Sequence, residues 1–386
     1  IILAVIMAAS VMEAAGGIDF LVRIAERIIR ANPKYVTIVA PLTTWTFTFV
    51  AGTGHIVYPL LPVIYETAHR SGIRPERPMA VATIASQQAI TASPVAAATA
   101  AMIGLFAEKG MTQWGLPQIL MVCVPATLTG VVAAAIVSMF VGKDLKDDPE
   151  YQARLAAGQI PAPQADTSRT PLKPGARLSA FIFLAGVALV VLFGFFPSLR
   201  QLPGAKSPLA MPIVIEILMM SVAALMLLLT KVPVDEVPKT ATLRAGVVAV
   251  IGIFGLAWLG DSFIAANKDV IVPAIGDWAK VAPWTFAFGL FLASVLLYSQ
   301  AATTRALMPL GIALGIPPQF LIAMFPSVNG YFFIPTYGSL IAAINFDLSG
   351  TTKIGKYVLN HSFMIPGLVA TSVAVFTGLA IARVIF

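Results

Sequence analysis

Residues 35–65 read YVTIVAPLTTWTFTFVAGTGHIVYPLLPVIY and contain no Asp, Glu, Lys or Arg. An α-helix crosses the hydrocarbon core of a bilayer with about 20 residues. This stretch is too long for one crossing and too short for two crossings joined by a loop. Its centre, Gly52-Thr53-Gly54-His55, carries glycines that break helices and expose the backbone. We predict a re-entrant helical hairpin with its tip at residues 52–55, a structure that a membrane tolerates only where protein or a cavity surrounds the tip.

The composition of the whole chain indicates a polytopic membrane protein. Of its 386 residues, 58% are hydrophobic and 11% are charged, whereas soluble domains have about 25% charged residues. So few charges cannot cover a soluble fold, which excludes a cytosolic enzyme, a disordered protein and a nucleic-acid-binding protein. The net charge of +7 favours anionic substrates only weakly. The single cysteine, Cys123, excludes an intrachain disulfide, and no Cys/His cluster suggests a metal site.

A second anomaly and a change of composition divide the chain. Residues 86–94 read SQQAITASP at the centre of another uncharged run, and a polar centre with a proline is typical of a discontinuous helix. Charged residues, Pro and Gln dominate residues 143–177, which we interpret as an extramembrane linker. Residues 1–142 then form a first transmembrane repeat, and residues 178–386 form a second.

The second repeat is predicted to contain the same two features. A polar tip at residues 299–303 is followed by Pro309, ten residues after Ser299, just as Pro62 follows Gly52. A broken helix is expected near residues 335–339, matching the one near residues 91–94. Paired broken segments in two halves are typical of a transporter site, because half-helix N-termini suit carboxylates and unwound carbonyls suit cations. The predicted fold class is all-α and polytopic, with two repeats that each contain a re-entrant hairpin and a broken helix.

The candidate substrate-binding residues lie at these four breaks. Small hydroxyl side chains and Gln can donate hydrogen bonds to carboxylates, and glycines expose backbone N–H groups. The alternative for the hydroxyl side chains is ordinary helix–helix hydrogen bonding or backbone capping, and for the glycines it is close packing. Arg305 is the charge nearest a predicted tip and could grip a carboxylate with two nitrogens; alternatively it pairs with Asp261 or Asp347. The predicted set is Gly52, Thr53, Gly54, Thr91, Ser93, Pro94, Ser299, Gln300, Thr303, Arg305, Pro335, Thr336 and Ser339.

Two titratable residues are candidates for proton coupling. His55 adjoins the first tip and titrates near neutral pH, and Asp261 lies in a predicted span, where an ionisable group suggests function. Structural hydrogen bonding or ion pairing is the alternative for both. We predict no catalytic residue, metal site or cofactor; a coupling ion would be H⁺ or Na⁺. No nucleotide-binding motif is visible in the sequence, so transport must draw on gradients or exchange.

Several stretches resemble the anaerobic C4-dicarboxylate transporter family (DcuA/DcuB). They cover essentially the whole chain and are specific in combination: ANPKYV (31–36), AGTG (51–54), IRPERP (73–78), ITASP (90–94), WLGD (258–261), LYSQAAT (297–303), IPTY (334–337) and SGTTKIGKYVLNH (349–361). The resemblance is closer to the DcuA branch. The family's N-terminal region is absent, so we interpret the chain as N-terminally truncated.

The resemblance implies exchange of fumarate, succinate, malate or aspartate across a bacterial inner membrane in anaerobic respiration. It also implies a homodimer with an ion-transporter-superfamily fold, in which two hairpin tips and two broken helices hold the dicarboxylate. The tips of such carriers have a Ser-Asn-Thr motif; here they offer fewer side-chain oxygens for Na⁺, so proton coupling or simple exchange is an equal alternative. The predicted function is antiport by alternating access. The rivals are a carrier of another organic anion such as citrate or gluconate, an ion-coupled symporter, a channel and a membrane-embedded enzyme.

Overall fold

The computed structural model describes residues 1–160, 171–205, 207–252 and 282–386, together with residues 255, 262, 266 and 267. Over these residues the regular structure is helical, and the only β pairing is an isolated bridge between Ile354 and His361. Within these ranges, five helices are long and apolar enough to cross a membrane, or six if one bent pair forms a span. The prediction of an all-α, multi-pass membrane protein is therefore confirmed.

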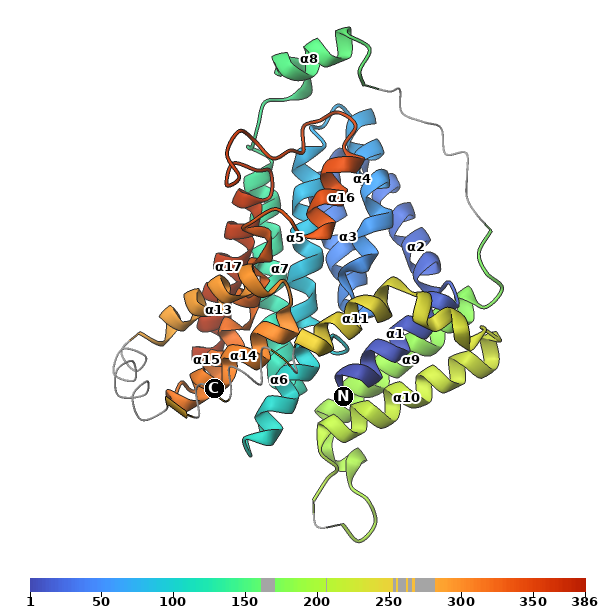
Figure 1. Ribbon diagram of the computed structural model, residues 1–386, viewed down its shortest axis with the longest axis vertical. Helices are drawn as coiled ribbons and strands as arrows, with labels where there is room; N and C mark the ends of the chain where they lie inside the picture. The colour runs from blue at the N-terminus through green and yellow to red at the C-terminus, as the bar shows by residue number, and fades with distance from the viewer. Residues whose placement is uncertain (161–170, 206, 253–254, 256–261, 263–265, 268–281) are drawn as a thin grey trace.

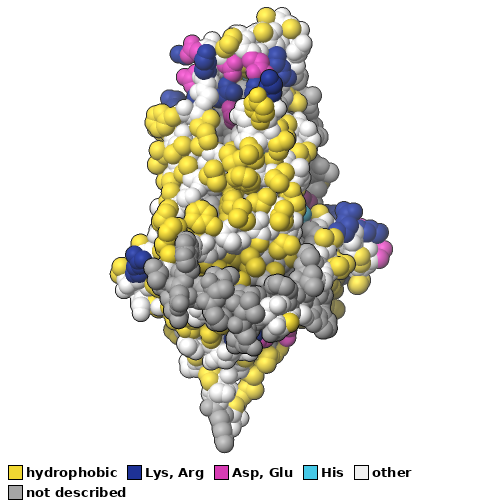
Figure 2. All heavy atoms as spheres, turned by 60° about the vertical axis from the view of Figure 1, so that its left-hand side comes forward, with side chains coloured by type: hydrophobic (Ala, Val, Ile, Leu, Met, Phe, Trp, Pro, Cys, Tyr) yellow, Lys and Arg dark blue, Asp and Glu magenta, His cyan; other side chains and the backbone are white. Residues whose placement is uncertain are grey.

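The candidate membrane spans lie in both halves of the chain. They are α5 with α6 (Glu76–Glu108), α7 (Leu116–Ser138), α9 (Ala176–Phe195), α10 (Met211–Thr230) and α17 (Met364–Ile385). The bent pair comprises α1 (Ile2–Ala14) and α2 (Gly17–Ala31), which meet at 74°. Figure 1 shows α7 and α17 side by side, and α1 packed against α9 and α10. In Figure 2 many charged side chains gather at the upper end, and many hydrophobic side chains lie on the face directly below it, as a surface in contact with lipid requires.

Residues 35–65 fold into two antiparallel helices that lie side by side. α3 (Val36–Ala51) ends at Gly52, whose φ of 69° is left-handed backbone that glycine adopts without strain. The Thr53 side chain then accepts a hydrogen bond from the His55 N–H and opens the short turn η2 (Gly54–Ile56). This turn leads into α4 (Val57–Arg70).

An ion pair shows that this helix pair begins and ends on the same side. Arg30, just before α3, lies 2.8 Å from Glu66 near the end of α4. The tip at residues 52–55 is therefore the far point of the pair. It rests on the break between α5 (Glu76–Ala92) and α6 (Ala97–Glu108). A Cβ atom at Gly52 would lie 2.5 Å from the carbonyl oxygen of Val95, within that break.

A second pair of helices folds back in the same way in the second half. α13 (Phe286–Leu297) and α14 (Gln300–Ala313) are joined at Tyr298 and Ser299. A Cβ atom at Gly311, near the end of α14, would lie 2.9 Å from the ring of Phe286 at the start of α13. Both ends of the pair therefore lie together, with the joint at the far point. There the Ser299 side chain caps α14 by accepting a hydrogen bond from the Ala302 N–H.

An interrupted helical segment follows this pair. α15 (Pro318–Met324) continues into the 3-10 helix η8 (Phe325–Phe332), and α16 (Gly338–Phe346) begins after an irregular stretch at residues 333–337. The predicted break near residues 335–339 falls on this stretch and on the first turn of α16. Pro335 has no backbone N–H to donate a helical hydrogen bond, and this favours the interruption there.

The two folded-back pairs approach the centre of the molecule from opposite ends. α4 ends beside the start of α5, at the end of the molecule where α8 (Pro149–Ala156) lies in Figure 1. α14 instead runs beside α6 towards the other end, where Arg305 pairs with Glu108. α5 is almost completely buried between these elements. Of the predicted linker, residues 161–170 lie outside the described residues.

Candidate substrate-binding site

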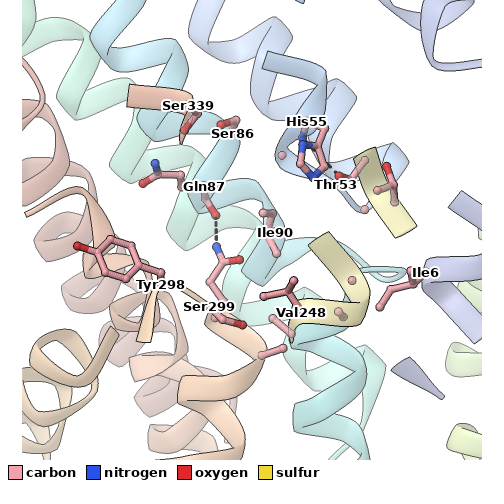
Figure 3. Close-up of a pocket in the computed structure, with 18 of the residues that line it drawn as sticks. Ile6, Thr53, His55, Ser86, Gln87, Ile90, Val248, Tyr298, Ser299 and Ser339 are labelled. Atoms are coloured by element: carbon pink, nitrogen blue, oxygen red, sulfur yellow. Dashed lines mark hydrogen bonds between the residues drawn. The ribbon is translucent and has the colours of Figure 1, made fainter. Parts of the chain in front are cut away.

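A cavity of about 670 Å³ lies where the two joints of the folded-back pairs meet α5. Its lining comes from both halves of the chain: residues 52–55 and 58, residues 297–302, several residues of α5, the first turn of α16, and parts of α1 and α11 (Ala241–Gly252). Figure 3 shows Ser86, Gln87 and Ile90 along α5, with Tyr298 and Ser299 on one side and Thr53 and His55 on the other. Sites for small molecules commonly have volumes of about 300–1,000 Å³.

The structure places part of the predicted set on this cavity. The residues that line it are Gly52, Thr53, Gly54, His55, Ser299, Gln300 and Ser339. They reach it because the glycine turn after α3, the cap of α14 and the start of α16 converge there. The lining contains no residue of the predicted break at 91–94.

The other predicted residues with hydroxyl groups bond to neighbouring groups. Thr91 donates a hydrogen bond to the Gln88 carbonyl (2.9 Å), and Thr303 donates one to the Ser299 carbonyl (2.8 Å). Ser93 accepts a bond from the Val95 N–H (3.3 Å). These are local bonds between a side chain and the nearby backbone, and the bond to Ser93 corresponds to the predicted alternative of backbone capping.

The remaining predicted residues lie near the cavity or away from it. Thr336 is bonded to Tyr298, which does line the cavity, with 2.7 Å between their hydroxyl oxygens. Pro94 and Pro335 are buried within the two interruptions. Arg305 lies outside the lining and pairs with Glu108 at 3.0 Å, a different partner from those considered for it. Asp261 lies outside the described residues.

A buried chain of amide groups joins the second tip to α5 and α17. The Gln300 side chain donates hydrogen bonds to the Gln87 carbonyl (2.9 Å) and to the Asn329 side chain. Asn329 in turn donates to the Gln88 side chain (3.2 Å), which donates to Thr371 (2.9 Å). All five residues are buried. The amide of Gln300 is therefore committed to holding the tip in place.

Three buried side chains on the cavity, those of Gln87, Ser339 and Thr242, carry polar atoms with no hydrogen-bond partner among the described residues. The amide nitrogen and amide oxygen of Gln87 are both unpaired, and so is the hydroxyl of Ser339. Gln87 is 2% exposed and Ser339 3% exposed, yet both line the cavity. Buried polar groups are normally hydrogen-bonded, so these groups are available to a ligand. Ser339 was predicted from sequence, whereas Gln87 was not; its signal was the polar pair Gln87-Gln88 in an apolar helix.

The cavity also has a permanent charge that the sequence analysis missed. Arg244 lines it from α11, and no other Lys, Arg, Asp or Glu does among the described residues. α11 is anchored by Glu13 of α1, whose carboxylate accepts hydrogen bonds from the N–H groups of Ala241 and Thr242, both 3.0 Å long. A carboxylate at a helix N-terminus stabilises that end of the helix. This contact holds the start of the α11 backbone, and the exposed side chain of Arg244, one turn further on, lines the cavity.

Comparison with known proteins identifies the family. The family of anaerobic C4-dicarboxylate membrane transporters matches residues 1–386. The chain belongs to this family. It is similar to DcuA of Escherichia coli K12, with 42% identity over 98% of this chain and 86% of the relative. DcuA of Wolinella succinogenes is 39% identical over 100% of this chain and 88% of the relative. DcuB of Escherichia coli CFT073 is 39% identical over 97% of this chain and 85% of the relative. The expected resemblance is confirmed, and the chain is a membrane transporter rather than an enzyme.

Proposed function

We propose that the chain carries C4-dicarboxylates, such as fumarate, succinate, malate and aspartate, across a bacterial inner membrane by antiport. The observation that carries the proposal is the cavity between the two helix tips, in which Arg244 is the one permanent charge among the described lining residues. A site with a single cation and several hydrogen-bond donors suits an anion. The names of its relatives state C4-dicarboxylates as their cargo.

The proposed site holds the substrate with side chains from both tips. Thr53 and Ser299 stand at the first and second tip, and the N-terminal end of α14 faces the cavity. A helix N-terminus favours negative charge through its free N–H groups and its dipole. We assign Thr53, Ser299 and Ser339 to carboxylate binding from the predicted set, with the glycines at 52 and 54 exposing backbone.

We also propose that residues 1–142 and 178–386 are two repeats of opposite orientation. The pairs α3–α4 and α13–α14 would be re-entrant hairpins, because each begins and ends on one side and the two approach from opposite ends of the molecule. The interrupted segments α5–α6 and α15–α16 would be the two broken helices. Alternating access then follows if these four units move together against the remaining helices. A homodimer, as the family resemblance implies, would supply a fixed frame for this motion.

The proton-coupling role stays a proposal for His55, which lines the cavity. Its ring stacks on Tyr58 with 5.9 Å between ring centroids. We expect H55Q protein to keep dicarboxylate exchange but to lose any response to an imposed pH gradient. Retention of that response would remove His55 from the coupling pathway.

The decisive experiment is uptake of radiolabelled succinate by purified protein in proteoliposomes. Vesicles are preloaded with fumarate or left empty, with and without Na⁺ and pH gradients. Antiport predicts uptake only into the preloaded vesicles. Ion-driven uptake into empty vesicles would instead identify a symporter. No uptake by folded protein would overturn the assignment, and competition by unlabelled citrate or gluconate would then test the other-anion rival.

A further inference from the structure

The Gln87 side chain restricts which ligands can form all their hydrogen bonds in the cavity. Its amide group is buried, lines the cavity, and has both its donor nitrogen and its acceptor oxygen unpaired. Its backbone carbonyl is already bound by Gln300, so α5 cannot rotate this residue away without breaking the contact with the second tip. Gln88 beside it has an amide that bonds to Asn329 and Thr371. Gln87 is therefore the glutamine of this pair that is left for a ligand.

The chemistry of an amide determines which ligand satisfies it. The nitrogen donates and the oxygen only accepts. An ionised carboxylate only accepts, so it can pair with the Gln87 nitrogen and with the Ser339 hydroxyl but never with the Gln87 oxygen. Figure 3 shows Ser339 beside Ser86 and Gln87, and α16 packs against α5. The Ser86 hydroxyl donates to the Thr83 carbonyl and is not a free donor. No described side chain donates to this amide oxygen, so a donor that the ligand carries next to its carboxylate satisfies it.

We propose that the Gln87 amide oxygen recognises a hydroxyl or ammonium group on the carbon next to a substrate carboxylate, while the Gln87 amide nitrogen and the Ser339 hydroxyl bind that carboxylate. The proposal rests on the function proposed above and ranks its substrates. L-malate and L-aspartate carry such a donor and satisfy both ends of the amide. The dianions of succinate and fumarate have no donor and leave the amide oxygen unpaired in a buried site. Substrates with a C2 donor are accordingly bound more tightly than unsubstituted ones.

The test measures competition against exchange of labelled fumarate in proteoliposomes of the full chain, at a pH where both carboxyl groups are ionised. Inhibition constants are determined for unlabelled L-malate, L-aspartate and succinate. The wild-type protein is expected to bind L-malate and L-aspartate about tenfold more tightly than succinate, the order of effect that one unpaired buried hydrogen-bonding group causes. In Q87M protein this advantage disappears, because the thioether neither donates nor accepts strongly.

Two further variants separate recognition from structural damage. Q88M removes the neighbouring amide, which is fully used within the protein, and should reduce the amount of active protein while leaving the substrate ranking unchanged. S339A removes a donor to the shared carboxylate and should weaken all three substrates by a similar factor. A Q87M protein that keeps the ranking overturns the proposal.

The wild-type ranking alone also decides the matter if Q87M does not fold. Equal binding of succinate and L-malate overturns the role of Gln87 while leaving dicarboxylate transport intact. Absence of exchange with every C4-dicarboxylate would instead overturn the proposed function. The two failures are therefore distinguishable in a single set of vesicles.

Discussion

Arg244 is the residue on which anion binding in the cavity should depend most. A carboxylate paired with a guanidinium group gains charge-assisted hydrogen bonds worth about 1.5–3 kcal/mol. We therefore expect R244Q to raise the half-saturation concentration for succinate about 10- to 100-fold, with R244K retaining part of the affinity. R305Q is the matched variant, because Arg305 pairs with Glu108 outside the lining. Transport kinetics of both variants check this; a larger loss in R305Q would return substrate binding to Arg305.

The residues of the site differ in how visible they were in the sequence. Thr53, Ser299 and Gln300 could be predicted because helix breaks have local signals, namely glycines, small polar residues and the spacing to a following proline. Arg244 had no such signal. Its place at the cavity follows from the position of α11, whose start bonds to Glu13, 228 residues away in sequence. A contact between residues so far apart in sequence produces no local sequence pattern from which it could be predicted.

At the scale of one element, the first tip depends on close approach of its backbone to the α5–α6 break. Alanine at Gly52 would place its Cβ atom 2.5 Å from the Val95 carbonyl oxygen at a φ of +69°. Gly72 has nearly the same φ, +70°, but nothing lies within 4 Å of its Cβ position. Both substitutions incur the left-handed backbone penalty of about 1–2 kcal/mol, and only G52A adds the clash. We expect G52A to abolish exchange and lower the unfolding temperature clearly more than G72A.

Comparison of G52A with G72A tests whether the first tip must dock on the α5–α6 break. Equal behaviour of G52A and G72A in transport assays and thermal unfolding would mean that the tip can shift away from residue 95. The tight contact would then have no role in the site. A selective defect in G52A would show that the tip must dock on the break, which sequence alone predicts only as two separate interruptions.

The second tip is held by the buried amide chain through Asn329. Leucine at this position would leave the Gln88 amide oxygen and one N–H of the Gln300 amide unpaired, although Gln88 would still donate to Thr371 and Gln300 to the Gln87 carbonyl. Each buried unpaired group costs about 1–3 kcal/mol, so we expect N329L to be strongly destabilised in thermal unfolding. N32L is the control, because the exposed Asn32 side chain bonds, within the described part of the chain, to the Ile28 carbonyl alone, and surface changes usually alter stability by about 0.5 kcal/mol or less. A stable N329L protein would show that Gln300 is positioned by other contacts.

The halves of the whole molecule are also joined at its charged end. Arg74 at the start of α5 binds Glu76 (2.6 Å) and Asp148 at the start of α8. Glu76 accepts a hydrogen bond from Ser362, in the loop before α17 (2.6 Å). Arg154 of α8 donates to the Ser349 carbonyl of the same loop (2.8 Å). Composition predicted residues 143–177 as an extramembrane linker. Which charged residues pair with each other could not be predicted, because the partners come together only in the folded chain.

This junction should make the stability of the whole molecule depend on acid. Burial by itself raises the pKa of Asp148, but the hydrogen bond from Arg74 and those from the backbone N–H groups of Tyr151 and Glu150 outweigh it and hold the pKa below its ordinary value of 3.8. A depressed folded-state pKa means that the unfolded chain binds the proton more readily. The stabilisation is therefore complete above the ordinary pKa and is lost as pH falls through the folded-state value.

D148N protein should reveal this dependence in thermal unfolding measured in detergent between pH 7 and pH 3. We expect it to be less stable than wild type at pH 7, because the amide cannot replace the charge that faces Arg74. The difference should narrow as pH falls below about 4, where the unfolded carboxyl is protonated. D235N is the control, since Asp235 lies 3.8 Å from Lys239 on an exposed turn and such pairs contribute little. Unfolding curves for D148N and wild type that coincide over the whole pH range would mean that the junction at Asp148 contributes nothing to stability.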